Sequence, residues 1–374
     1  MRLRLAQALV RLAAIILPSR LRDWGLAMVD ELAAIERPGA ALSFALGCLA
    51  GAIRQRMSFN HSSEGALQMP LKPLLHPRRL AALCAIGATG LGISYMMAAG
   101  APLSYPAINV AALAIGLLAI GAVTEAGRLW RIPGGGAVDL MLAGLVLLTA
   151  LTGISADGAT RWVSIGGTLL QPALFLVPIL ALRFARSRGP LSLAGILVSA
   201  IALALQPDRA MAGALAAGMA ALALTRPERT VLIALAGAAA GFAATLVRPD
   251  NSPAVPFVDQ VYFSSFEVHP LAGIAVLAGT ALLLVPALAG LVRDSAHRSS
   301  YAVFGAVWLA VVLAAALGNY PTPFVGYSGS AILGYMISLL ALPRGPAART
   351  ARGAAPSHSQ EERPSLREGL PVAG

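Results

Sequence analysis

Ten long apolar stretches follow one another between residues 80 and 342, and this succession constrains the fold more than any other feature. A bilayer core of ~30 Å is crossed by a helix of about 17–25 apolar residues. Within lipid every backbone polar group needs an internal partner, so only helices and closed barrels span a membrane. Because the stretches are rich in Ala, Leu and Gly and do not alternate in polarity, the sequence predicts an all-α polytopic membrane protein.

Only 12% of the residues are charged, too few to cover a soluble domain of 374 residues. We therefore predict ten transmembrane helices, which cover residues 80–100, 106–124, 136–153, 164–184, 190–205, 209–224, 230–247, 270–293, 299–317 and 325–342.

The arginines lie almost entirely on one side of these spans. Connections after odd-numbered spans contain only Arg161, Arg209 and Arg248. Connections after even-numbered spans contain Arg128, Arg131, Arg183, Arg186, Arg188, Arg226, Arg229, Arg293, Arg298, Arg344, Arg349 and Arg352. Positively charged loops stay in the cytoplasm, so we predict that both termini are cytoplasmic. These arginines account for the net charge of +11, and no basic surface interleaved with aromatics indicates nucleic-acid binding.

The first 57 residues differ from the rest of the chain. Short helices are predicted at about 4–16, 19–36 and 39–57, and the second is amphipathic, as in a small packed unit or a membrane-surface segment. The apolar run 40–53 is short for a span, so 1–57 is interpreted as a cytoplasmic or interfacial prefix. Residues 58–78 are predicted to be a linker, 79–342 the membrane domain and 343–374 a disordered tail. Cys48 and Cys84 lie in apolar surroundings and indicate small buried residues.

The unusual polar residues gather in the connections predicted to lie outside. The third connection contains GATRWVSIGGTLLQP, the fifth LQPDRA, the seventh VRPDNSPAVPFVDQVYFSSFEVHP and the ninth GNYPTPFVGYSGS. Four such segments in this order, on one predicted face of a ten-span protein, form a specific combination.

Together they resemble the SEDS family, which includes FtsW, RodA and SpoVE and serves division, elongation and sporulation. The resemblance covers about residues 80–342 and leaves the prefix outside. The matching residues are Gly158, Ala159, Arg161, Trp162, Gly166, Gln171, Pro172, Phe175, Gln206, Pro207, Asp208, Asp259, Glu267, Pro321, Pro323, Phe324, Val325, Tyr327, Gly329 and Ser330.

The resemblance implies a multi-pass protein of the bacterial cytoplasmic (inner) membrane, a peptidoglycan glycosyltransferase that polymerises lipid II, a disaccharide peptide on a polyprenyl pyrophosphate. It implies that Asp259 is the general base. Without the resemblance, Asp259 would be interpreted as a solvated loop carboxylate. The resemblance also implies a single-span transpeptidase partner, contact with membrane lipids and a substrate site that includes Arg161, Trp162, Gln171, Asp208, Glu267, Tyr327 and Ser330. A divalent cation such as Mg²⁺ is compatible with the reaction, but no ligand cluster for one is evident.

Several of these residues have a structural alternative. Arg161 could bind pyrophosphate with Trp162 packed on lipid or sugar, or the two could be an interfacial anchor pair. Asp208 is interpreted first as the N-cap of the sixth span. Glu267 could pair with Arg161 or Arg248, and a lipid headgroup is the favoured contact for Arg209 and Arg248.

The chain also departs from the family pattern. Ala173 and Leu174 replace the Ser and Glu of the family's Q-P-S-E-F segment, and Val177 replaces the Lys that follows it. The seventh connection is much shorter than the corresponding loop of the family. Further changes are Arg209, Ala210 and Met211 after Q-P-D, and Gly326 and Ser328 in the last motif. Two alternatives therefore stay open: a catalytically degenerate paralogue that binds lipid II as a scaffold or regulator, and a flippase for lipid-linked precursors. No phosphate loop or histidine cluster indicates an ATPase or a zinc enzyme.

Overall fold

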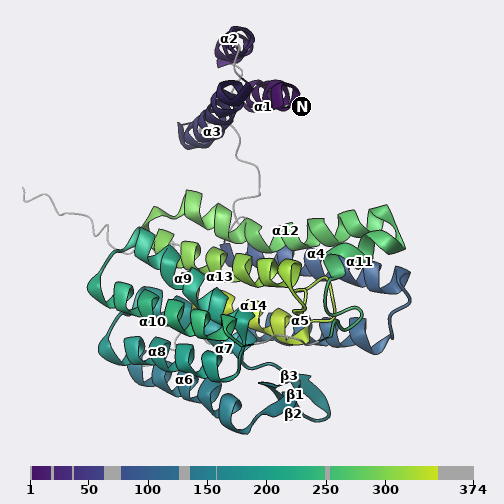
Figure 1. Ribbon diagram of the computed structural model, residues 1–374, viewed down its shortest axis with the longest axis vertical. Helices are drawn as coiled ribbons and strands as arrows, with labels where there is room; N and C mark the ends of the chain where they lie inside the picture. The colour runs from purple at the N-terminus through teal and green to yellow at the C-terminus, as the bar shows by residue number, and fades with distance from the viewer. Residues whose placement is uncertain are drawn as a thin grey trace, which may run out of the picture.

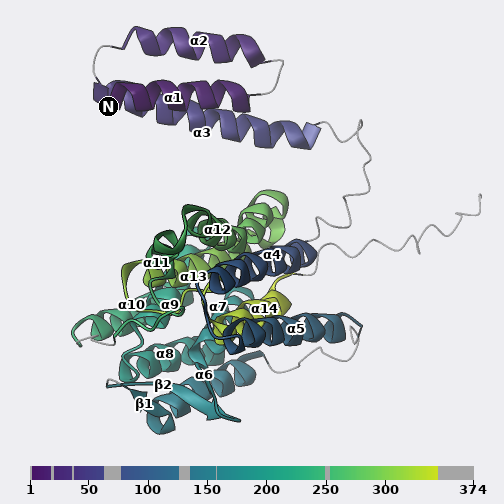
Figure 2. The same cartoon turned by 90° about the vertical axis from the view of Figure 1, so that its right-hand side faces the viewer.

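The computed structural model describes residues 2–17, 21–35, 38–62, 77–125, 135–156, 158–248 and 253–343. The N-terminal part forms three helices, α1 (Arg2–Ile16), α2 (Arg22–Ala33) and α3 (Pro38–Ser62), which run side by side in Figure 2. Ala6, Val10, Leu32, Ala41 and Ala45 form a small core between them. Helix α3 continues beyond its predicted end into the region predicted to be a linker. Residues 63–76 of that linker and all but the first residue of the predicted disordered tail lie outside the described residues, and the last two residues of the predicted linker begin α4 (Pro77–Ala98).

The membrane part is a helical bundle, which confirms the predicted all-α polytopic fold (Figure 1). In the described ranges ten of its helices match the ten predicted spans. They are α4 (Pro77–Ala98), α5 (Ser104–Glu125), α6 (Gly135–Thr152), α7 (Ala173–Arg186), α8 (Pro190–Leu205), α9 (Arg209–Thr225), α10 (Arg229–Leu246), α12 (Pro270–Arg293), α13 (Arg298–Leu317) and α14 (Gly329–Ala341).

Six of the described helices are long and apolar enough to cross a membrane: α4, α5, α6, α10, α12 and α13. Helices α7, α8, α9 and α14 are shorter, with 14, 16, 17 and 13 residues. Among these short helices α7 is the most enclosed. It packs on α6, α8, α9, α13 and α14, and ten of its 14 residues are buried. A helix enclosed in this way does not need the full length of a lipid-facing span.

The prediction of the fourth span was wrong at its start. Instead of a helix from 164, the chain forms a three-stranded antiparallel sheet of β1 (Ile154–Ala156), β2 (Ala159–Ile165) and β3 (Thr168–Leu170). Gly166 and Gly167 join β2 to β3 with φ angles of 59° and 80°, a conformation that glycine adopts without a steric penalty. Because this turn precedes Gln171, the helix begins only at Ala173.

The seventh connection contains an additional short helix, α11 (Val261–Val268). Its buried residues Val261, Tyr262 and Ser265 lie on one side. Val261 and Tyr262 join a satellite hydrophobic cluster with Tyr95, Met96, Val276 and Val325. Helix α11 and the three strands lie at the same end of the bundle (Figure 1), which we call the strand end. The opposite end, where α7 ends and α8 begins, is called the arginine end.

A buried arginine joins the first and last helices of the bundle at the arginine end. Arg78 of α4 donates through Nη2 to the backbone oxygens of Leu340 and Leu342, at 2.9 and 2.5 Å. These carbonyls belong to the C-terminal turn of α14, where helix carbonyls lack an intrahelical donor. The contact therefore closes the bundle between its two chain ends.

Candidate functional site

Residues from all four sequence motifs meet at the strand end of the bundle. They come from strand β2, the turn 206–208, the loop 253–260 and the loop 318–328. Backbone hydrogen bonds join the last two loops, and side-chain hydrogen bonds join the hairpin to the turn 206–208 and to Ser330. The four motifs are thus linked at one end of the bundle, the same end that their distribution over odd-numbered connections predicts.

Arg161 on β2 lies where three motifs meet. Its side chain is buried, with 5% of its surface exposed, and Nη2 donates to the backbone oxygen of Pro207 at 2.6 Å. The guanidinium carbon lies 5.6 Å from the centre of the Tyr320 ring and 6.0 Å from that of Trp162, within the range of a cation–π interaction. An interfacial anchor would expose its guanidinium, so burial makes Arg161 a cation of the site interior.

Gln171 and Asp208 form a buried polar pair next to the hairpin of β2 and β3, on the part of the site that we call the hairpin side. The Gln171 Nε2 donates to Asp208 Oδ2 at 2.7 Å, and the Gln171 backbone N–H donates to Ser330 Oγ at 3.1 Å. Asp208 Oδ1 accepts from the Met211 backbone N–H at 3.1 Å, which confirms its predicted role as the N-cap of α9. Both side chains of the pair are buried, so the link holds the start of α7 against the start of α9.

Asp259 lies in the loop before α11 and is 8% exposed. Its Oδ2 accepts from the backbone N–H of Val255 at 2.9 Å. Burial raises the pKa of Asp259 above its usual range, while the Val255 hydrogen bond opposes the rise. The alternative interpretation of Asp259 as a solvated loop carboxylate is therefore wrong. A carboxylate with a raised pKa is better suited to accept a proton.

The loop that contains Asp259 is paired with the ninth connection. Thr322 N–H donates to Val258 O at 2.8 Å, and Tyr327 N–H donates to Phe257 O at 2.7 Å. Gly326 approaches so closely that a Cβ there would lie 2.8 Å from Phe257 O. The two carbonyls that precede Asp259 are therefore both held by the 318–328 loop.

Tyr327 and Ser330 have defined positions in this arrangement. The Tyr327 ring stacks on Tyr105 of α5, with centroids 4.3 Å apart and an interplanar angle of 18°. Tyr105 also meets Phe257 edge-on at 6.2 Å. Half-buried aromatic rings thus lie beside the Asp259 loop, and Ser330 accepts the backbone N–H of Gln171 on the hairpin side.

The expected ion pair of Glu267 with Arg161 or Arg248 does not form in the described part of the chain. Glu267 is exposed on α11, and Arg161 and Arg248 bind backbone oxygens instead. An exposed carboxylate keeps its hydration without a cationic partner, so α11 is placed by its buried face and not by Glu267.

An apolar groove of about 620 Å³ lies between α8 and α10 and does not include Asp259. Small residues, among them Ala200, Gly237 and Gly241, line it, and Arg248 closes its strand end. Arg209 Nη2 donates to the backbone oxygen of Arg248 at 3.1 Å, so both cations of this region lie near the end of the groove.

No group of three or more His, Cys, Asp or Glu side chains able to hold a metal occurs among the residues that the structure describes. The divalent cation considered from the sequence therefore has no prepared set of protein ligands in this region.

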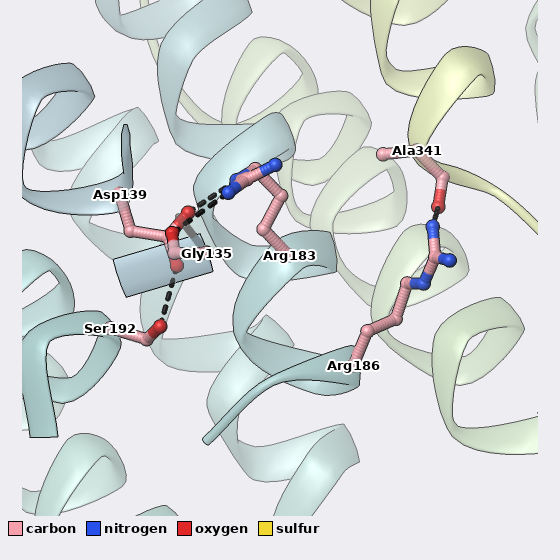
Figure 3. Close-up of polar contacts among 6 residues, drawn as sticks. All are labelled: Gly135, Asp139, Arg183, Arg186, Ser192 and Ala341. Atoms are coloured by element: carbon pink, nitrogen blue, oxygen red, sulfur yellow. Dashed lines mark hydrogen bonds and ion pairs between the residues drawn. The ribbon is translucent and has the colours of Figure 1, made fainter. Parts of the chain in front are cut away.

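Sequence reasoning missed two buried polar groups. Asn109 on α5 is fully buried and contacts the 318–328 loop. At the arginine end, Asp139 of α6 forms an ion pair with Arg183 of α7 and accepts from Ser192 of α8 (Figure 3). An amide or carboxylate within an apolar helix is the available signal, because such a group is costly without a partner.

Comparison with solved structures agrees with this fold. The chain is similar to the rod shape determining protein RodA of Thermus thermophilus, at 20% identity and a TM-score of 0.51, over 71% of this chain and 97% of that one. An Asp-to-Ala variant of the same RodA gives 21% identity, a TM-score of 0.50 and coverages of 71% and 98%. No family model matches the sequence, and no curated protein matches it either. The chain is therefore a multi-pass membrane protein with a RodA-like fold.

Proposed function

We propose that this protein is a SEDS-type peptidoglycan glycosyltransferase that polymerises lipid II at the outer face of the bacterial cytoplasmic membrane, in division or cell-shape maintenance. The observation that carries the proposal is the buried Asp259 with its raised pKa, held in a network that also fixes the buried Arg161. A proton acceptor and a cation are what transfer from a sugar pyrophosphate requires.

In the proposed reaction the Asp259 carboxylate takes the proton of the acceptor sugar's 4-hydroxyl. The oxygen forms a bond to the anomeric carbon of the donor, and the bond from that carbon to the pyrophosphate oxygen breaks. The polyprenyl pyrophosphate leaves with the bonding electron pair, and Arg161 stabilises its negative charge. Charge-assisted hydrogen bonds to phosphate oxygens are the contacts that arginine makes best.

Both substrates carry a long polyprenyl chain, so the protein needs an apolar surface open to lipid. The groove between α8 and α10 offers such a surface, with Arg209 and Arg248 at the end nearest the site. We place the polyprenyl chain of the acceptor lipid II there and its pyrophosphate toward these arginines, whereas Arg161 contacts the pyrophosphate of the donor. A single-span transpeptidase is the proposed protein partner, and the termini are placed in the cytoplasm.

The test is polymerisation of labelled lipid II by purified protein in proteoliposomes, with and without a candidate transpeptidase. Wild-type protein is expected to form polymer, and Asp259→Asn is expected to lose about 10²-fold or more of the rate, the usual contribution of a general base. Asp294→Asn is a matched control, because Asp294 lies at the arginine end and contacts His297. Equal polymer from Asp259→Asn and wild type would contradict the role of Asp259.

A catalytically degenerate scaffold is the second candidate, and the environment of α7 favours it. Ala173, Leu174 and Val177, which replace polar family residues, are all buried in the packing between α7 and its neighbours. Leu174→Glu with Val177→Lys would restore a pair at i, i+3 spacing, where opposite charges can meet. Polymer formed only by the restored protein would support the scaffold, and polymer formed by wild type would exclude it.

A further inference from the structure

Both polar atoms of the Asn109 side-chain amide form hydrogen bonds with one loop, 318–328. Asn109 lies in α5 and is 0% exposed. Its Nδ2 donates to Gly326 O at 2.7 Å, and its Oδ1 accepts from Ser328 N–H at 3.1 Å. The amide thus holds the backbone on both sides of Tyr327, across sequence separations of 217 and 219 residues.

The loop held by Asn109 in turn holds the loop of Asp259. Tyr327 N–H, next to both contacts of Asn109, donates to Phe257 O, and Thr322 N–H donates to Val258 O. These carbonyls belong to the two residues before Asp259. Every link from the Asn109 amide to the Asp259 backbone is therefore a hydrogen bond or a peptide bond.

The backbone in these loops needs such external support. Phe257, Gln260 and Phe324 have φ angles of 65°, 55° and 67°, in the left-handed region that non-glycine residues rarely occupy. Residues in such conformations persist only when the surrounding structure determines them. Two strained residues flank Asp259 closely and the third lies in the loop that Asn109 holds, so without Asn109 both loops have more favourable conformations available.

We propose that Asn109 is a positioning residue, which sets the place of the Asp259 carboxylate through the 318–328 loop. The inference rests on the proposed function for its kinetic consequence, but its geometric content is independent of it. Asn109 is not the base or a substrate ligand, because both polar atoms of its side chain already bind the loop.

The kinetic experiment compares Asn109→Ala with wild type in the lipid II assay. Displacing a reacting group by about 1 Å can cost ~10²-fold in rate, so kcat is expected to fall by that order while KM changes little. Asn109→Asp is the conservative variant. Its protonated form can donate to Gly326 O as the amide does, so the activity of this variant, as a fraction of wild type at the same pH, is expected to be higher at low pH and to fall as pH rises.

A second measurement reads the loop position without catalysis. Val261 is fully buried, and its Cγ2 lies 3.1 Å from a Cβ built on Gly326. Val261→Cys in the full chain with Cys48→Ala and Cys84→Ala reports access of a maleimide to the junction of the two loops. Adding Asn109→Ala is expected to speed labelling by about tenfold or more, the effect of ~1.4 kcal/mol on local opening.

Ser199→Ala is the matched control, since Ser199 is equally buried but its hydroxyl binds Gly195 O of its own helix. It is expected to change neither readout. Unchanged labelling in Asn109→Ala, or an unchanged kcat from an active wild type, would overturn the inference. If wild type makes no polymer, the proposed function fails, and labelling alone decides: faster labelling supports the positioning role and unchanged labelling refutes it.

Discussion

The side chain of Gln171 donates from Nε2 to the Oδ2 of Asp208 at 2.7 Å, and this bond joins two motifs that lie 37 residues apart in the chain. Because Asp208 Oδ1 caps α9, one carboxylate serves both the hairpin side of the site and the start of a membrane helix. Structural and functional roles are thus combined in one residue, and substitutions at Asp208 can separate them.

Asp208→Ala is expected to destabilise the protein. The lost cap costs about 1 kcal/mol, and the buried Gln171 amide left without its acceptor costs about 1–3 kcal/mol more. Asp208→Asn keeps an oxygen for the Met211 N–H, and its Nδ2 can donate to the Oε1 of Gln171 once that side-chain amide turns over, so this variant is expected to retain thermal stability and polymerisation close to wild type. Melting curves and the lipid II assay check both variants. An Asn variant that melts normally but makes no polymer would show that the charge acts on substrate.

The raised pKa of Asp259 predicts opposite pH trends for activity and stability. Only the carboxylate accepts a proton, so polymerisation is expected to rise as pH increases through the raised pKa. A folded-state pKa above the ordinary 3.8 means that folding favours the protonated form. The contribution of protonated Asp259 to folding stability is fully present below pH 3.8 and is lost as pH rises through the folded-state pKa.

Asp259→Asn is therefore expected to melt at a higher temperature than wild type at pH 7, with the difference shrinking toward pH 4. The Asn oxygen can still accept from Val255 N–H, so the loop contact is retained. Thermal unfolding in detergent at the two pH values measures the effect, with Asp294→Asn as the control. A lower melting temperature for Asp259→Asn at pH 7 would contradict a desolvated carboxylate.

The ion pair of Asp139 and Arg183 is expected to stabilise the arginine end of the bundle (Figure 3). Asp139 Oδ2 also accepts from Ser192 Oγ at 2.6 Å, and Arg183 Nη2 donates to Gly135 O at 2.8 Å. Asp139→Ala is expected to cost about 3 kcal/mol, the lower end for breaking a buried pair, because Arg183 keeps 22% of its side chain exposed.

A double-mutant cycle with Asp139→Leu and Arg183→Leu separates the pair from its burial cost. Removing both charges is expected to recover much of the stability lost with Asp139 alone, since no buried charge is then left unpaired. Strictly additive losses in the cycle would show that the two side chains act independently.

The arginine distribution predicts which end of the bundle faces outward. Ala254 at the strand end and Ser295 at the arginine end are both exposed. In intact cells, a membrane-impermeant maleimide is expected to label Ala254→Cys and to spare Ser295→Cys until the membrane is opened, in the Cys48→Ala and Cys84→Ala background. The reverse pattern would invert the topology and remove the basis of the proposed function.

The helices were predictable from the sequence because long apolar runs leave a chain in lipid few alternatives. The hairpin before α7 was not, since Val163, Leu169 and Leu170 extend the apolar run of the fourth span and mask the turn at Gly166 and Gly167. Helix α11 was missed because the whole helix is only eight residues long, too short to show a clear helical period.

Some site residues were likewise predictable from the sequence and others were not. The sequence and its family resemblance indicated Asp259, Arg161, Gln171 and Asp208, and the structure brings their motifs together. Asn109 stands out in the sequence only as an amide within an apolar helix, and its role could not be assigned, because its partners are backbone atoms more than 200 residues away. Pairing between the backbone groups of two loops leaves little mark in the sequence beyond Gly326, where a Cβ would lie 2.8 Å from Phe257 O.

The hydrogen bonds from Arg78 to the backbone oxygens of Leu340 and Leu342 join the first helix of the membrane bundle to the end of its last helix. Whatever precedes Pro77 and whatever follows Pro343 are therefore tethered to neighbouring points on the same rim.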